Sequence, residues 1–113
     1  HDGPGTLTLN GANSFTGVTG NISGTLVNNG RLAGALSNDA IIRNAGTVLG
    51  GLVNRALASN LPTGSIQQGV SNSGVFSNAG TVQGGLVNTA QASNLVTGSI
   101  QQGVDNSGTL YNS

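Results

Sequence analysis

The feature that most constrains the fold of this chain is a tandem repeat of 34 residues. Residues 44–77 and 78–111 align without a gap and are identical at 26 of the 34 positions. Asn112 opens a further copy, which predicts that the chain (1–113, a single segment) is a fragment of a longer array. Tetratricopeptide repeats have the same length, but each copy here is rich in Gly and Asn, which are unfavourable in helix interiors. Short β-strands separated by turns are therefore expected.

A finer period lies within the 34 residues. Medium-sized apolar residues recur in groups of three, and the groups start 16 or 18 residues apart. All of these spacings are even, as strand alternation requires of side chains that share one face. The spacing predicts an all-β fold, a three-sided parallel β-helix (solenoid) of about six coils of 16 or 18 residues. The predicted inward residues are Leu26, Leu32, Leu36, Ile42, Val48, Leu52, Ala58, Ile66, Val70, Phe76, Val82, Leu86, Ala92, Ile100, Val104 and Leu110.

The 18-residue coils carry two extra residues each. The extra residues fall in the segments 59–65 and 93–99, and Pro62 lies in the first of them. Proline suits a loop or bulge better than a central strand position. We therefore expect a small loop to protrude from one edge of every second coil.

Most of the 15 Asn residues fall into two columns of the predicted solenoid. They are Asn28, Asn44, Asn60, Asn78, Asn94 and Asn112 in one column, and Asn38, Asn54, Asn72, Asn88 and Asn106 in the other. Two properties of Asn explain such columns. Asn tolerates the left-handed backbone that a sharp corner needs, and its amide can hydrogen-bond from coil to coil. At the remaining corner Gly34, Gly50, Gln68, Gly84 and Gln102 take this place.

Composition excludes several functions. Charged residues are only 5% of the chain and the net charge is zero, which argues against nucleic acid as a partner. The absence of Cys and the single His argue against metals and other cofactors. The three Asp residues are too far apart in the predicted coils for a hydrolase pair, so we do not expect an enzyme. No apolar run is long enough for this segment to insert into a membrane.

The segment from Gly5 to Gly17, GTLTLNGANSFTG, resembles the autotransporter-associated β-strand repeat, with Phe15 where that repeat commonly has Tyr. We assign this repeat to residues 1–25. The units 28–34 and 78–84 resemble the passenger repeats of type V autotransporters and filamentous-haemagglutinin-like adhesins. The resemblance implies a right-handed parallel β-helix that is exported to the extracellular surface of a Gram-negative bacterium. It also implies adhesion to a host cell-surface or matrix molecule, or association with another copy of the chain.

Our main hypothesis is a structural and interaction segment of a surface-displayed adhesin passenger, in which outward Asn, Gln, Ser and Thr pair one rod with another. A passive stalk that displays a distal binding domain is the first alternative, and a glycan-binding or glycan-cleaving β-helix is the second. The candidate interaction residues are Gln67, Gln68, Gln101, Gln102, Pro62 and Tyr111. Two interpretations without a partner stay open, namely a ladder of glutamine side chains and an isolated surface tyrosine.

Overall fold

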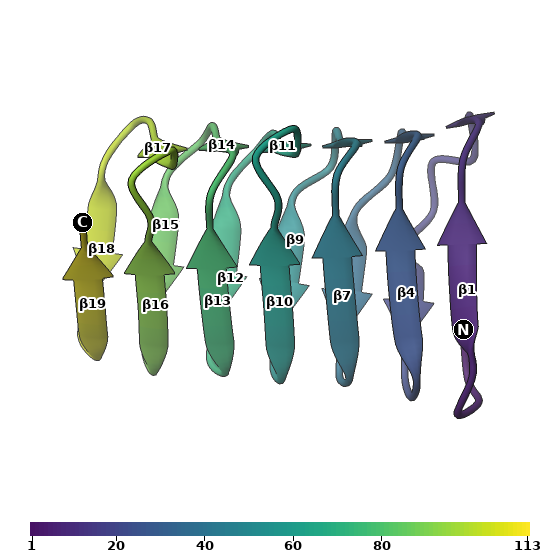
Figure 1. Cartoon of the computed structure of the whole chain (residues 1–113), viewed down its shortest axis with the longest axis horizontal. Coiled ribbons are helices and arrows are strands. Elements are labelled where there is room, and N and C mark those ends of the chain that lie inside the picture. The colour runs from purple at the N-terminus through teal and green to yellow at the C-terminus, as the bar shows by residue number, and fades with distance from the viewer.

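The chain winds into a three-sided parallel β-solenoid, as the spacing of its apolar residues predicts (Figure 1). The computed structural model describes residues 1–113, which form three parallel sheets and no helix. We name the sheets A, B and C in the order in which the chain visits them. One circuit is a coil, so coil 1 comprises β1–β3, coil 6 comprises β16–β18, and β19 begins a seventh. The body measures 30 × 24 × 22 Å.

The strands are short and stack in register from coil to coil. Sheet A contains β1 (Thr6–Leu9), β4 (Thr25–Asn28), β7 (Ile41–Asn44), β10 (Leu57–Asn60), β13 (Val75–Asn78), β16 (Gln91–Asn94) and β19 (Thr109–Asn112). Sheet B contains β2 (Ala12–Asn13), β5 (Arg31–Leu32), β8 (Thr47–Val48), β11 (Ser65–Ile66), β14 (Thr81–Val82) and β17 (Ser99–Ile100). Sheet C contains β3 (Thr19–Asn21), β6 (Leu36–Asn38), β9 (Leu52–Asn54), β12 (Val70–Asn72), β15 (Leu86–Asn88) and β18 (Val104–Asn106).

The predicted inward residues form the apolar core. Thirteen of the sixteen, from Leu26 to Ala92, are buried, and Ile100 and Leu110 pack partly buried against them. The exception is Val104, which is 41% exposed. Its strand, β18, is the edge strand of sheet C, so no neighbouring coil covers the side chain.

The core column on sheet A fills its space by alternating large and small side chains. Ala58, Phe76 and Ala92 lie opposite one another on three successive coils. All three are buried, and Phe76 is only 1% exposed. Because protein interiors are close-packed, one aromatic ring between two alanines serves the space that an aliphatic residue on each coil would otherwise fill.

Both Asn columns are hydrogen-bonded ladders, and they lie inside the solenoid. In the ladder from Asn28 to Asn112, each Nδ2 donates to the Oδ1 of the Asn on the next coil at 2.8–2.9 Å. The ladder on sheet C starts at Asn21, one coil earlier than predicted, and runs to Asn106 at 2.7–3.0 Å. The amides also donate to turn carbonyls, so these buried polar groups are satisfied.

One reason given for the Asn columns is wrong. No Asn residue has a left-handed backbone, because each ladder Asn ends a strand and points its side chain inward. The left-handed residues other than Gly are Gln68 (φ 67°) and Gln102 (φ 69°), at the corner between sheets B and C. The amides are thus used for bonding between coils, and the sharp corner is formed by Gln and Gly.

Candidate interaction surface

The ladder Asn residues are removed from the outer surface. Nine Asn side chains are at most 1% exposed, and the later members of each ladder open to solvent only near coil 6. The expectation that outward Asn pairs one rod with another is therefore wrong for the ladder positions, which are occupied within the chain. The surface available to a partner is made by the outward strand positions and the three corners.

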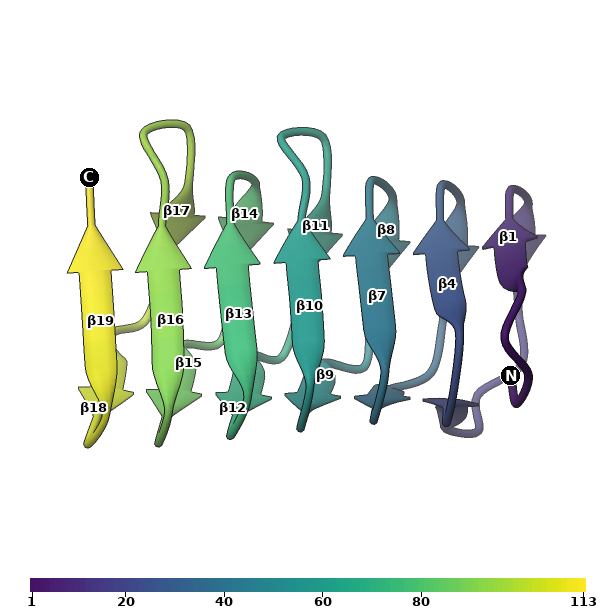
Figure 2. The ribbon, with the colours of Figure 1, turned by 60° about the horizontal axis from the view of Figure 1, so that its bottom comes forward.

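The corner between sheets A and B alternates long and short turns. Coil 4 has the long loop 61–64 and coil 6 has the long loop 95–98, as the two extra residues predict. The turns of coils 3 and 5 between the same sheets contain only Ala and Gly, at 45–46 and 79–80. Figure 2 shows the two long loops, between β10 and β11 and between β16 and β17, rising above their neighbours. We name these two loops the loop row.

The tips of the loop row are exposed and apolar. Pro62 lies exposed in the first loop. At the equivalent position of the second loop, Val96 is 84% exposed and the neighbouring Leu95 is 41% exposed. Each loop is tied back to the preceding coil, because Thr63 Oγ1 donates to the Ala45 carbonyl at 2.8 Å and Thr97 Oγ1 to the Ala79 carbonyl at 2.7 Å. The tips are therefore apolar groups on anchored loops.

The corner between sheets B and C forms a lengthwise groove. Its deepest part has a volume of about 240 Å³ and a floor of glycine backbone that includes Gly51, Gly69 and Gly85. Val53 and Val87, which point outward from sheet C, form one wall. A second hollow of about 310 Å³ continues it over coils 5 and 6 as far as Asp105. No charged side chain lines the deepest part, so the groove offers no group for acid–base chemistry there.

The predicted glutamine residues come together at this corner. The main-chain N–H of Gln67, Gln83 and Gln101 donates to the coil before, so the three stand in one column. Gln83 extends the predicted strip, and its place next to Val82 in the repeat could have identified it. The hydrogen bonds that hold these residues are main-chain bonds, which does not support a ladder of glutamine side chains.

Pro62 and Tyr111 lie apart from the glutamine corner. Pro62 belongs to the loop row. Tyr111 is on β19 of sheet A, where it points outward, is 59% exposed and lies opposite Ser93 of the preceding coil. The candidate residues thus occupy three separate places on the solenoid.

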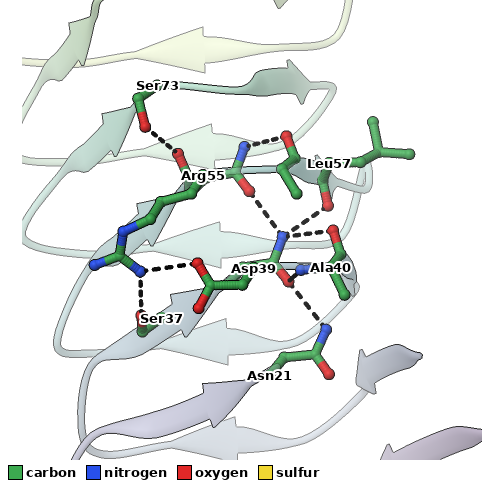
Figure 3. Close-up of polar contacts among 10 residues, drawn as sticks. Asn21, Ser37, Asp39, Ala40, Arg55, Leu57 and Ser73 are labelled. Carbon is green, nitrogen blue, oxygen red and sulfur yellow. Dashed lines mark hydrogen bonds and ion pairs between the residues drawn. The ribbon is translucent and has the colours of Figure 1, made fainter. Parts of the chain in front are cut away.

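Charge is confined to the two ends of the molecule. No charged residue occurs between Arg55 and Asp105. Arg55 reaches back over one coil, where its Nη1 lies 3.1 Å from Asp39 Oδ1 and 3.0 Å from Ser37 Oγ (Figure 3). Both charged side chains are about half exposed, so this ion pair contributes at most about 1 kcal/mol.

Nothing in the structure assembles a cofactor site. No three His, Cys, Asp or Glu side chains come close enough to hold a metal ion together. No helix is present that could cross a membrane. Searches of protein-family models, of curated proteins and of solved structures each found no match.

Proposed function

We propose that this chain is a structural and interaction segment of a surface-displayed bacterial adhesin passenger, and that it acts by self-association or by attachment to a host molecule. The resemblance of residues 5–17 to the autotransporter-associated β-strand repeat supports the export and the bacterial surface. The observation that carries the interaction role is the long uncharged outer surface between Arg55 and Asp105, which repeats with the solenoid.

A repeating surface suits association through many weak contacts. An isolated coil exposes only a few side chains, and a stable interface needs about 800 Å² from each partner. Coils that are held rigidly in register present the same contacts again along the axis, so the contacts act together once the first has formed. Because the surface is neutral, this association is expected to depend little on salt between 50 and 500 mM NaCl.

Beads coated with the chain test the proposal. We expect coated beads to cluster at neutral pH, and uncoated beads in the same buffer to stay dispersed. Binding of the labelled chain to cultured host cells tests the attachment branch separately. Coated beads that stay dispersed, together with a chain that binds no cell, would contradict both branches.

The passive stalk is supported by a different observation. Two continuous Asn ladders and three parallel sheets tie each coil to the next, as a rigid spacer requires. A stalk needs no surface contacts of its own, so the dispersed beads and unbound cells described above are the result that favours it.

A further inference from the structure

We infer that the loop row is the surface through which two copies of this chain recognise each other. In this arrangement the solenoids lie side by side and antiparallel, and the long loops of each copy lie over the short turns of the other. The inference rests on the proposed self-association and specifies its site.

The spacing of the turns makes this corner complementary to itself. Neighbouring strands in a sheet are about 4.8 Å apart, so long loops two coils apart stand about 10 Å from each other. The intervening turn at residues 79–80 has two residues fewer than the long loops. A second solenoid has the same period of two coils, and a shift by one coil places its long loops over short turns.

An antiparallel pair uses all four loops. Running one copy backwards, with its coil 4 beside coil 5 of the other, also places its coil 6 beside coil 3. Coils 3 and 5 are the coils with short turns, at 45–46 and 79–80. Long loops from the two copies then alternate along four successive coils. The contact is symmetric, so it closes a dimer and does not propagate sideways.

The chemistry of the loop row fits a neutral partner. The tips carry Pro62 and Val96, the short turns between them contain only Ala and Gly, and the chain from 56 to 104 has no charged residue. An anionic glycan, an acidic peptide or a nucleic acid would find no cation to pair with here. A second copy offers apolar tips and small residues in return, and burial of such tips is favourable.

Sedimentation equilibrium of the full chain and of two aspartate variants tests the inference. Val96→Asp places a charge in the contact, and we expect it to raise the dissociation constant at least tenfold, a factor that corresponds to about 1.4 kcal/mol. Val96 is 84% exposed, so this change leaves the core intact. Val87→Asp is the matched control on sheet C, where the next coil already carries Asp105. We expect it to change the constant less than about twofold, as surface substitutions away from a contact do.

Cross-linking tests the antiparallel register. The chain has no cysteine, so Val96→Cys and Ala45→Cys variants can be mixed and oxidised without interference. The antiparallel pair brings residue 96 of one copy over residue 45 of the other, and we expect a covalent dimer from this mixture. A parallel pair shifted by one coil would instead link Pro62→Cys to Ala79→Cys without linking 96 to 45.

The outcomes separate the inference from the proposed function. If Val96→Asp associates as tightly as the unaltered chain, the loop row is not the contact, while self-association stands. If the unaltered chain stays monomeric at every concentration and coated beads stay dispersed, self-association itself fails. Association that Val87→Asp abolishes and Val96→Asp does not would move the contact to the valine wall of sheet C.

Discussion

The first coil and the coils that follow it are built by different rules. Coils 2 to 6 advance by 16 or 18 residues and bury an aliphatic or aromatic residue on every side. In coil 1, Leu7 pairs with Leu26, which is a step of 19 residues. Asn13 then stands opposite the core residue Leu32, and Leu9 stands opposite Asn28, where every later coil has Asn.

The difference shows what the Asn ladder requires. Each ladder amide accepts from the coil before it and donates to the coil after it. Leu9 has no donor to offer, and Asn28 Oδ1 is buried without a hydrogen-bond partner. Asn21, which heads the second ladder, has the same unpaired Oδ1. A ladder is therefore satisfied only along its interior, and its first member bears the cost of an unpaired acceptor.

The largest expected effect separates the aromatic residues of the two regions. Phe76→Ala removes a ring that is 1% exposed between Ala58 and Ala92, so three alanines would stack and leave a cavity. We expect it to lower the free energy of unfolding by about 4 kcal/mol. Phe15 in coil 1 is 47% exposed, and Phe15→Ala should cost under about 0.5 kcal/mol. Urea denaturation followed by circular dichroism measures both, and equal losses would contradict the division between the two regions.

The second effect compares asparagines. Asn54 accepts from Asn38 and donates to Asn72 and to the carbonyls of Ala56 and Val75. Asn54→Ala leaves these buried groups without partners, and we expect a loss of about 3 kcal/mol in the free energy of unfolding.

Asn13 is the matched control for this substitution. Its amide donates only to the Gly11 carbonyl at 3.2 Å, in an exposed turn of coil 1. Asn13→Ala should cost no more than about 0.5 kcal/mol. If the two variants melt together in urea, the ladder bonds contribute nothing beyond those of ordinary surface amides.

The sequence predicts coils 2 to 6 well because their information is periodic. Even spacing of apolar residues identifies both the inward face and the strand register, and thirteen of the sixteen predicted core residues are buried. The ladder on sheet C was traced from Asn38 onward. Asn21 was missed because its distance to Asn38 is 17 residues, which breaks the spacing of 16 or 18 on which the columns were built.

Local backbone conformation and surface contacts are less accessible from the sequence. Asn is a plausible left-handed residue, and the columns alone do not show whether its side chain caps a corner or lies inside. The Gln residues at the sharp corner were predicted by their column, and Gln68 and Gln102 do take positive φ there. Which outward residues meet a partner has no periodic signature, since every outward column repeats equally well. The extra residues of the loop row are the exception, because they repeat only on every second coil.

The smallest expected effect is a gain, and it extends the interior rule into coil 1. Leu9→Asn places an amide opposite Asn28, whose Oδ1 has no donor. Satisfying a buried acceptor recovers about 1–3 kcal/mol, while the half-buried Leu9 side chain forfeits less than about 1.5 kcal/mol of apolar burial. We expect the variant to be more stable by about 1 kcal/mol, measured as a higher urea midpoint.

Leu9→Ala separates the two contributions to this gain. It removes the same apolar contact with Asn28 and the core without supplying a donor, so it should be destabilised by about 1 kcal/mol. The difference of about 2 kcal/mol between Asn and Ala at position 9 would then measure the bond to Asn28 Oδ1. If Asn and Ala are equally destabilising, the ladder does not accept a new member in coil 1. The 19-residue step would then disturb the geometry of the first coil more than the missing amide does.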